Sequence, residues 1–332
     1  MNSGIFDWSG ASVLVTGGTG SFGKQFVATM LNEYRPRRLA VLSRDELKQS
    51  EMARQFPVGS DSPMRYLLGD VRDADRLRRA FDGVDIVVHA AAMKQVPAAE
   101  SDPFEAVLTN IMGTKNVIDA AIDGGVKRVF TLSTDKAVNP VNLYGATKLV
   151  SEKLTIQANT YGQAKGCSFA CCRYGNVVGS RGSVVPLFKR QKRSGKITIT
   201  DKRMTRFWIT LDQGVRFVIR CIEQMKGGEV FVPKIPSMKM TDLAEALAPD
   251  AEKIEVGIRP GEKLHEALIG ADESRLVKEF DDHYVLYPAY QNWSEEDLSA
   301  AGKSMEDRFR YQSNTNGWDL TQSELLEMAE DE

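Results

Sequence analysis

The sequence has few cysteines, and their spacing argues against a fold held together by metal or by disulfides. Cys167, Cys171, Cys172 and Cys221 form no C-x-x-C pair and accompany no His-rich segment. Structural zinc sites and the disulfide frameworks of small secreted domains show such spacings. The cysteines therefore predict reduced, mostly buried thiols in a cytosolic protein that has no metal site.

An excess of charge and a long apolar run are also absent. The 43 Lys and Arg residues nearly balance the 45 Asp and Glu residues, which does not favour nucleic acid or an acidic surface as a partner. No apolar stretch approaches the ~18 residues of a membrane span, and residues 1–10 lack the basic and apolar regions of a signal peptide. A chain of 332 residues buries a large core, so we expect a cytoplasmic protein with neither nucleic acid nor a membrane as partner.

A glycine-rich turn follows the first apolar run of the chain. Residues 11–16 are rich in β-branched side chains, and Gly17-x-x-Gly20-x-x-Gly23 comes directly after them, before a helical pattern that continues through Leu31. Glycines allow a tight turn and a close approach to a pyrophosphate, which the N-terminus of the next helix favours electrostatically. Although the spacing differs from G-x-G-x-x-G, it predicts the start of a dinucleotide-binding sheet.

The second strand, at residues 38–43, ends where dinucleotide-binding folds select their cofactor. An acid at this strand tip accepts a hydrogen bond from the 2′-hydroxyl of NAD, whereas a base holds the 2′-phosphate of NADP. Arg44 with Lys48 one helical turn later favours NADP, and Asp45 leaves NAD open. In the alternative interpretation, both bases only face solvent at the start of a helix.

Two further strand ends carry polar or small residues. Asp70 follows the third strand and suits the adenine amino group, while Asp73 suits equally the N-cap of a helix over residues 74–81. Small residues from Ala90 onward allow backbone to pass close to a cofactor. Lys94 either reaches the cofactor or the substrate, or remains solvated.

The segment after the fifth strand is the richest in reactive groups. It begins with Thr134, Asp135 and Lys136 and continues to the pair Tyr144-x-x-x-Lys148. In a helix the members of that pair share one face. An ammonium group there favours the phenolate and lowers a tyrosine pKa from its free value of about 10. Such a phenolate can remove a hydroxyl proton during hydride transfer.

Three later residues carry polar groups at positions suited to a ligand. Asn176 lies beyond the end of a sixth strand, Arg259 presents a fork of donors for a diphosphate, and Glu262 presents acceptors for ribose or sugar hydroxyls. The alternative for Arg259 and Glu262 is a surface pair.

These motifs resemble those of the extended short-chain dehydrogenase/reductase family. The glycine turn and the Tyr144-x-x-x-Lys148 pair carry the resemblance, which extends from residue 11 to about residue 288. Within the family, the sequence closely resembles the inverting UDP-N-acetylglucosamine 4,6-dehydratases, which begin pseudaminic acid synthesis. The matching segments are residues 43–49, 132–136, 142–148, 173–184 and 259–266.

The resemblance implies a fold class and an assembly. It implies an α/β protein with a Rossmann-type doubly wound parallel sheet and a smaller C-terminal α/β substrate domain. The expected divisions are an NADP-binding domain at residues 1–175 with returns at about 207–235, a mainly substrate-binding domain at 176–290, and a C-terminal tail at 291–332. The sequence from Asp319 onward carries six acidic residues and no basic one, which itself predicts a solvated segment or a contact with another subunit. A homo-oligomer, with a hexamer as one form, is implied as well.

The resemblance also implies binding residues. It places on NADP Gly17, Thr19, Gly20, Ser21, Phe22, Gly23, Ser43, Arg44, Lys48, Asp70, Val71, Ala90, Lys94, Tyr144 and Lys148. It places around the UDP-sugar Lys94, Lys136, Asn176, Arg181, Gly182, Ser183, Val184, Thr198, Arg259 and Glu262.

The mechanism implied by the resemblance uses two sets of residues. Tyr144, oriented by Lys148 and Thr134, takes the O4 proton while hydride leaves C4 for NADP. Elimination of water across C5 and C6 then needs a base and an acid. The resembling enzymes use the lysine corresponding to Lys136 as base and the aspartate corresponding to Asp135 as acid.

That assignment makes demands on the backbone and on protonation. Consecutive strand residues point to opposite faces, so Asp135 and Lys136 can address one sugar only if the backbone has left the strand; Asn139-Pro140 makes an irregular loop plausible. Lys136 must also be partly neutral and Asp135 able to hold a proton, which burial can bring about. A surface ion pair is the simpler interpretation of these two residues.

Two alternative functions remain open from the sequence. A UDP-sugar 4-epimerase also oxidises C4 but needs no elimination pair, so Asp135 and Lys136 count against it. A non-catalytic NADP-binding regulatory protein needs neither step, and the presence of Tyr144, Lys148 and Thr134 argues against it.

Overall fold

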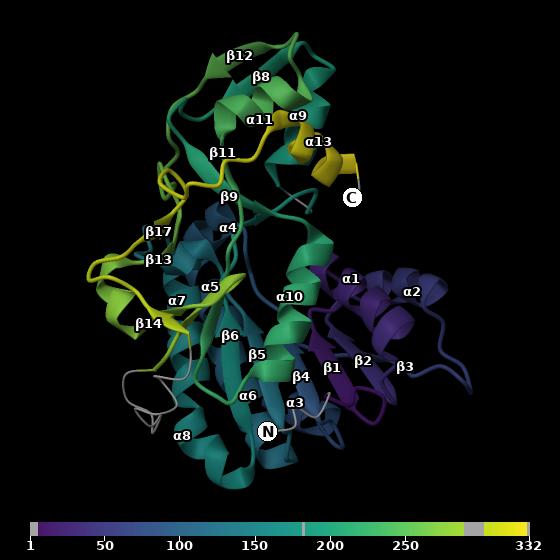
Figure 1. Ribbon diagram of the computed structural model, residues 1–332. Helices are drawn as coiled ribbons and strands as arrows, with labels where there is room; N and C mark the ends of the chain where they lie inside the picture. Colours follow the sequence, from purple (N-terminus) through teal and green to yellow (C-terminus); the bar gives the residue numbers. More distant parts are fainter. Residues whose placement is uncertain (1–5, 181–182, 289–301, 331–332) are drawn as a thin grey trace. The chain divides into compact units, whose positions relative to one another are not determined.

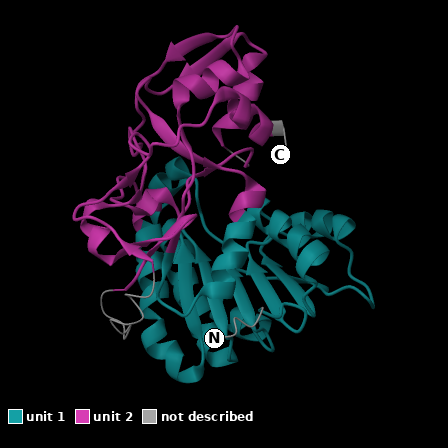
Figure 2. Cartoon of the chain, in the orientation of Figure 1, with its two compact units in different colours: residues 1–133, 147–172, 215–230 teal, residues 134–146, 173–214, 231–332 magenta. Residues whose placement is uncertain are grey.

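The computed structural model describes residues 6–180, 183–288 and 302–330, and its internal contacts separate into two units (Figure 2). Unit 1 comprises residues 1–133, 147–172 and 215–230, and unit 2 comprises residues 134–146, 173–214 and 231–332. The segment 134–146 therefore belongs to unit 2, although the strands on either side of it in the sequence belong to unit 1.

Unit 1 is built on parallel strands in the order β6, β5, β4, β1, β2, β3 (Figure 1). All five residues of β1 are buried, as expected for a central parallel strand covered on both faces. The order is that of a Rossmann-type doubly wound sheet, so the predicted fold class is confirmed. The strands are β1 Ser12–Thr16, β2 Arg38–Ser43, β3 Met64–Leu68, β4 Ile86–His89, β5 Arg128–Leu132 and β6 Ser168–Cys172.

The helices of unit 1 begin and end at residues suited to those positions. Asp45 caps α2 by accepting a hydrogen bond from the backbone of Lys48, and Asp73 caps α3 in the same way, which confirms the N-cap interpretation of Asp73. Gly125, in the left-handed region with φ 68°, ends α6.

The helical elements that lie wholly in unit 1 are α1 Ser21–Thr29, η1 Met30–Tyr34, α2 Glu46–Gln55, α3 Ala74–Ala80, α4 Val96–Ser101, α5 Pro103–Ala106, η2 Val107–Met112, α6 Gly113–Gly124, α8 Asn159–Gly162 and η4 Gln163–Lys165. Helices α7 Leu143–Gln157 and α10 Leu211–Gln224 begin in unit 2 and continue in unit 1.

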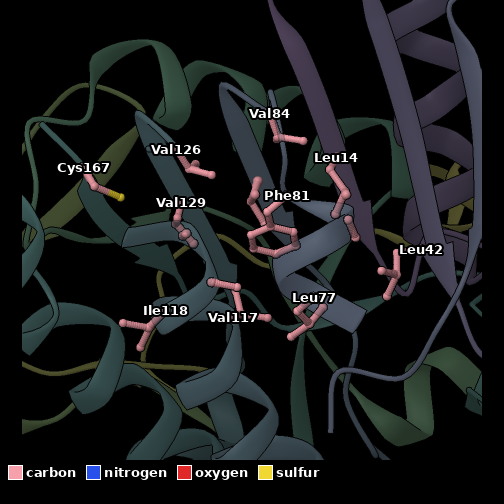
Figure 3. Close-up of a cluster of buried hydrophobic side chains, with 14 of the residues drawn as sticks. Leu14, Leu42, Leu77, Phe81, Val84, Val117, Ile118, Val126, Val129 and Cys167 are labelled. Atoms are coloured by element: carbon pink, nitrogen blue, oxygen red, sulfur yellow. The ribbon is translucent and has the colours of Figure 1, made fainter. Parts of the chain in front are cut away.

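A hydrophobic cluster fixes α3 and α6 against the sheet of unit 1. Figure 3 shows Phe81, the residue that ends α3, among Leu14 of β1, Val117 of α6 and Val129 of β5. Phe81 is fully buried, and fully burying a side chain of this kind contributes about 1.5–3 kcal/mol. The cluster holds the strands whose carboxyl ends carry the glycine turn and Asp70.

Unit 2 combines small sheets with short helices (Figure 1). Its strands are β7 Asn176–Val177, β8 Lys196–Ile199, β9 Thr205–Ile209, β11 Ser237–Lys239, β12 Glu252–Glu255, β13 Ala267–Ile269, β14 Val277–Glu279, β15 His283–Leu286, β16 Lys303–Ser304 and β17 Tyr311–Gln312, while β10 Val230–Pro233 begins in unit 1. Its helical elements are η3 Asp135–Ala137, α9 Val184–Lys192, α11 Met240–Leu247, η5 Ala271–Leu276 and α13 Gln322–Glu330.

The C-terminal segment is part of the core of unit 2, which corrects the expectation of a tail that faces solvent or another subunit. Leu325 and Ala329 of α13 are buried with Leu243 of α11, and Leu320 joins the same cluster. The acidic residues suggested a solvated segment, but the apolar residues four positions apart form a buried helix face. The first part of the expected tail, up to residue 301, lies outside the described residues.

Two sequence-wide features can be checked in this structure. Cys167, Cys171, Cys172 and Cys221 are free and buried, as predicted. Within the ranges described above, no helix has both the length and the apolar character needed to cross a bilayer.

Candidate active site

The glycine turn of unit 1 has the geometry that a phosphate-binding turn requires. The amide of Gly17 donates to the carbonyl of Leu42 at 2.8 Å, and Gly17 has φ 67°. A Cβ at Gly17 would lie 2.8 Å from the Cα of Ala91, so the turn passes directly against the small-residue segment that follows β4. The N-cap of α1 is Gly20, which has no side chain to satisfy the first amides of the helix.

Four predicted cofactor residues lie at or near the end of β2. The Oγ atoms of Thr19 and Ser43 lie 2.9 Å apart. Asp45 accepts from the backbone of Lys48 at 3.0 Å and from its Nζ at 2.7 Å. The hydrogen bond from the Lys48 side chain is the main reason that the pKa of Asp45 is lowered. The carboxylate of Asp45 is therefore engaged in starting α2, and Arg44 is exposed beside it.

The remaining predicted cofactor residues of unit 1 differ in exposure. Asp70 accepts from two nitrogens of Arg72, at 2.9 and 2.7 Å, and Arg44 lies 3.5 Å from it. The side chain of Val71 is buried in the core, Ala90 is partly buried, and Lys94 is exposed. Ser21 and Phe22 begin α1 together with Gly23.

Asp135 and Lys136 lie in a 3-10 turn and not in a strand. Strand β5 ends at Leu132, and Thr134 caps η3 by accepting from the backbone amide of Lys136 at 3.3 Å. Lys136 Nζ donates to Asp135 Oδ1 at 2.9 Å. The Asp135 side chain is 1% exposed. The backbone has thus left the strand as predicted, and the surface ion pair is excluded.

Lys136 is surrounded by acceptors in unit 2. Its Nζ lies 3.5 Å from Asn176 Oδ1 and 3.7 Å from Glu266 Oε1. Burial alone would lower the pKa of Lys136, but the carboxylates of Asp135 and Glu266 together raise it above its ordinary value. This corrects the expectation of a partly neutral amine, because two nearby negative charges outweigh the desolvation of the ammonium group.

The start of α7 holds Tyr144 next to this turn. Gly145 donates to Asn142 Oδ1 at 2.7 Å, and a Cβ at Gly145 would lie only 2.2 Å from the carbonyl oxygen of Lys136. Glycine is therefore required for α7 to approach η3 so closely. This contact fixes the distance between the backbones that carry Tyr144 and Lys136.

The pKa of Tyr144 is raised, contrary to the expected lowering. Burial raises it most, while the positive charge of Lys136 and a hydrogen bond with Thr134 oppose that effect. Within unit 2 the ammonium group that favours the phenolate is thus Lys136. Lys148, one helical turn later on α7, is buried, and burial lowers its pKa against the attraction of Glu152.

The predicted substrate residues of unit 2 are only partly brought together. Asn176 lies next to Lys136, as stated above. Ser183 is the N-cap of α9, Val184 is its first residue, and Thr198 Oγ1 accepts from Gln191 at 2.9 Å. The carboxylate of Glu262 accepts from the backbone amide of Arg259 at 3.3 Å. Arg181 and Gly182 lie outside the described residues.

Comparison with known proteins shows the family of the chain. The family model described as "Polysaccharide biosynthesis protein" matches residues 13–288. The chain belongs to this family. It is 52% identical over 326 residues to "UDP-N-acetylglucosamine 4,6-dehydratase (inverting)" from Campylobacter jejuni, with 96% of each chain covered. This match confirms the predicted resemblance.

A second curated relative has a different named activity. The chain is 40% identical over 285 residues to "UDP-glucose 4-epimerase" from Rickettsia canadensis, which covers 83% of this chain and 82% of that protein. Family membership therefore leaves the choice between dehydration and epimerisation to the residues of the site.

Solved structures confirm the fold. The structure of Pen from Bacillus thuringiensis matches with a TM-score of 0.89 and 37% identity, covering 98% of each chain. DesIV, a dTDP-glucose 4,6-dehydratase from Streptomyces venezuelae solved with NAD and TYD bound, matches with a TM-score of 0.66 and 25% identity, covering 76% of this chain and 86% of that one.

Several residues near Lys136 were not predicted from the sequence. These residues are Glu266, Arg206 and Lys263. The carboxylate of Glu266 forms ion pairs with Lys136 at 3.7 Å, with Arg206 at 3.9 Å and with Lys263 at 3.6 Å. We refer to Asp135, Lys136, Tyr144, Arg206, Lys263 and Glu266 as the Lys136 cluster. Glu266 closes the matching segment 259–266, so its motif pointed to a functional role, but its contact with a residue 130 positions earlier did not follow from the sequence.

The described residues offer no group of three His, Cys, Asp or Glu side chains suited to a metal ion.

Proposed function

We propose that this protein catalyses the NADP-dependent 4,6-dehydration of UDP-N-acetylglucosamine with inversion at C5, the first step of pseudaminic acid biosynthesis. The observation that carries the proposal is the buried Asp135 with its carboxylate 2.9 Å from Lys136 Nζ. Hydride transfer needs one base, and elimination of water needs a further acid and base. The Lys136 cluster provides all three groups, and the relative from Campylobacter jejuni is named for this reaction.

Tyr144 serves the oxidation of C4. Its phenolate accepts the O4 proton, and Lys136 and Thr134 both favour that phenolate. NADP held at the glycine turn would supply the hydride acceptor for C4 and the hydride donor for C6. Lys148, on the same helix, completes the pair that this chain shares with the short-chain dehydrogenases.

Asp135 and Lys136 serve the elimination. Lys136 begins as an ammonium ion, and its proton passes to Asp135 across their 2.9 Å hydrogen bond. A buried ion pair and its neutral tautomer can be close in energy, because both ions lose their hydration. The neutral amine then takes the C5 proton, and the carboxylic acid donates to O6 as water leaves. The pair returns to ammonium and carboxylate, so protons balance.

Completion of the reaction inverts the sugar. Reduction at C6 is accompanied by the addition of a solvent proton to C5, from the face opposite to the one that lost its proton, and Tyr144 releases the O4 proton to solvent, so the whole turnover balances. The product is UDP-2-acetamido-2,6-dideoxy-β-L-arabino-hexos-4-ulose.

Arg44 supports NADP over NAD. Asp45, the acid that would bind a 2′-hydroxyl, is engaged with the backbone and side chain of Lys48. Arg44 carries an exposed guanidinium group at the same strand end, and guanidinium binds phosphate through paired hydrogen bonds. The bound NAD in DesIV supports a nicotinamide cofactor in general.

The UDP-sugar contacts are proposed for unit 2. Asn176 is 3.5 Å from Lys136, which suits contact with the reacting hexose, and Arg259 and Glu262 suit the diphosphate and a ribose. The other proposed contacts are Lys136, Arg181, Gly182, Ser183, Val184 and Thr198, together with Lys94 of unit 1.

We also propose that the protein forms a homo-oligomer. Phe104, Leu108 and Met112 are spaced four residues apart along α5 and η2, and each is exposed, Phe104 to 81%. Exposed apolar side chains that lie close together mark interaction sites on soluble proteins. We propose that a second copy of the chain covers these three.

A UDP-sugar 4-epimerase is the second candidate, and the relative from Rickettsia canadensis favours it. An epimerase oxidises and reduces C4 alone, so it has no use for a buried acid and base beside the tyrosine. Asp135 and Lys136 therefore favour dehydration.

The product formed from UDP-N-acetylglucosamine in deuterated water tests the proposal. We expect NMR to show a 6-deoxy-4-keto sugar of the L-arabino configuration with deuterium at C5. A D-xylo product would retain dehydration and contradict inversion. A sugar changed only at C4 would establish the epimerase, and NADP binding without turnover of any UDP-sugar would indicate a regulatory protein.

A further inference from the structure

Glu266 is a buried carboxylate that has no role in the mechanism given above. Its side chain is only 4% exposed. Its amide donates to Ser313 Oγ at 3.0 Å, and its carbonyl accepts from the amide of Ser313 at 2.8 Å. Both the amide and the carbonyl of Glu266 are thus hydrogen-bonded to Ser313, which fixes the direction in which the Glu266 side chain leaves the backbone.

The carboxylate of Glu266 lies among three cations. Oε1 is 3.7 Å from Lys136 Nζ and 3.9 Å from Arg206 Nε, and Oε2 is 3.6 Å from Lys263 Nζ. These distances exceed those of hydrogen bonds, and Oε2 has no hydrogen-bond partner among the described residues. Burying a carboxylate is costly unless its charge is paired, so Glu266 depends on these three cations.

Each of the three cations also has a partner other than Glu266. Arg206 donates to the carbonyls of Thr205 at 2.7 Å and Lys263 at 3.0 Å. Lys263 Nζ donates to the carbonyl of Val138 at 2.5 Å. Lys136 Nζ donates to Asp135 at 2.9 Å, but Asp135 loses its charge in the proposed reaction, whereas the carbonyl partners do not change. Lys136 is therefore the cation for which Glu266 matters most.

We propose that Glu266 is a positioning residue for the elimination step, whose negative charge holds the ammonium group of Lys136 beside Asp135 and Asn176. The inference rests on the proposed function. Lys136 faces Asp135 and Glu266 as anions, Arg206 as a cation, and Tyr144 as a titratable neighbour. Among these groups, Asp135 is transiently protonated in the proposed reaction and loses its charge, whereas Glu266 keeps its charge throughout and retains Lys136 while the proton moves.

The substitution Glu266→Gln tests this role, because it removes the charge and preserves the shape. Without the negative charge, Lys136 releases its proton more easily. The reactive pair must hold one proton, so the alkaline limb of the kcat profile should move to lower pH, by about one unit. Because Lys136 is then held less firmly beside Asp135, we expect kcat to fall while KM for UDP-N-acetylglucosamine stays close to its original value. Glu266→Asp, which keeps the charge, should move the alkaline limb part of the way back.

Two further variants make the test specific. Lys263→Met removes a cation next to Glu266, so the same limb should move to higher pH, which keeps the inference testable if Glu266→Gln does not fold. Glu279→Gln is the matched control, because Glu279 pairs with Lys234 at 3.0 Å, away from the cluster, and should leave the limb unchanged.

The outcomes separate this inference from the proposed function. A wild-type enzyme that does not dehydrate UDP-N-acetylglucosamine contradicts the proposed function. An active wild type whose alkaline limb is unmoved in both Glu266→Gln and Lys263→Met contradicts only the role of Glu266, as does a shift of the Glu266→Gln limb to higher pH.

Discussion

The glycine turn of unit 1 and the Lys136 cluster of unit 2 solve different physical problems. In the turn, the groups proposed to bind the cofactor are backbone amides, and the charged side chains nearby are exposed, with Arg44 58% exposed. In the cluster, two carboxylates and three cations are gathered with little exposure. The turn depends on the close backbone contacts that glycines allow. The cluster depends on charged groups that shift the pKa values of their neighbours. Substitutions in the turn should therefore change packing and cofactor binding, whereas substitutions in the cluster should change the pKa values of the reacting groups.

The largest effect is expected from the loss of charge in the cluster. Lys136→Met removes the proposed base of the elimination, and steady-state dehydration should fall by about 10²- to 10⁴-fold. Burial raises the pKa of Tyr144, and the ammonium group of Lys136 offsets part of that rise. Removal of Lys136 should therefore raise the pKa of Tyr144 further. Reduction of the cofactor in a single turnover should then require a higher pH, which stopped-flow absorbance can measure. A profile that keeps its wild-type position would contradict the coupling.

A loss of space in the turn should act on stability. A Cβ at Gly23 would lie 2.3 Å from the Cα of Gly18, and overpacking of this kind costs about 1–3 kcal/mol. We expect Gly23→Ala to lower the midpoint of denaturant unfolding and to weaken NADP binding. Gly59→Ala is the control, because a Cβ there meets nothing within 4 Å. Equal midpoints for the two variants would contradict the packing argument.

A change of one exposed charge should alter cofactor choice alone. Arg44→Ser removes the proposed partner of the 2′-phosphate, so the Kd for NADP should rise about tenfold, equivalent to about 1.4 kcal/mol, while the Kd for NAD should change little. Fluorescence titration measures both. Arg37→Ser removes a similarly exposed guanidinium elsewhere in unit 1 and should leave both values unchanged. An equal loss of affinity for NAD would contradict the assignment.

The smallest effect is expected at a helix start remote from both regions. Asp73 caps α3 through the amide of Arg76 at 2.9 Å, and loss of such a cap costs about 1 kcal/mol. Asp73→Ala should lower the free energy of unfolding by this amount and leave kcat unchanged. A large fall in kcat would mean that the acidic turn after β3 has a catalytic role.

The contrast between the two regions also explains what the sequence could predict. The glycine turn and β2 at Arg38–Ser43 are local patterns, and the structure has them as expected. The 3-10 turn at Asp135 followed from a local signal as well. The raised pKa of Lys136 did not, because it depends on Glu266 as well as on the adjacent Asp135, and Glu266 is distant in the sequence and was recognisable only as part of a motif.

Two other differences have the same kind of cause. The C-terminal acids indicated a solvated segment, but Leu325 and Ala329 are buried against α11, a partner that a single helix pattern does not identify. The raised pKa of Tyr144 follows from burial, which a pair spaced four residues apart does not reveal. Local patterns thus located the site, and long-range packing determined its electrostatics.

A single-turnover experiment with Asp135→Asn tests the central claim most directly. This variant keeps the positive charge of Lys136 beside Tyr144 but removes the group that carries the proton for elimination. With UDP-N-acetylglucosamine and bound NADP, the absorbance of reduced nicotinamide should rise and persist, and no 6-deoxy sugar should form. If Asp135→Asn still forms the 6-deoxy-4-keto sugar at the wild-type rate, the Asp135–Lys136 pair does not perform the elimination.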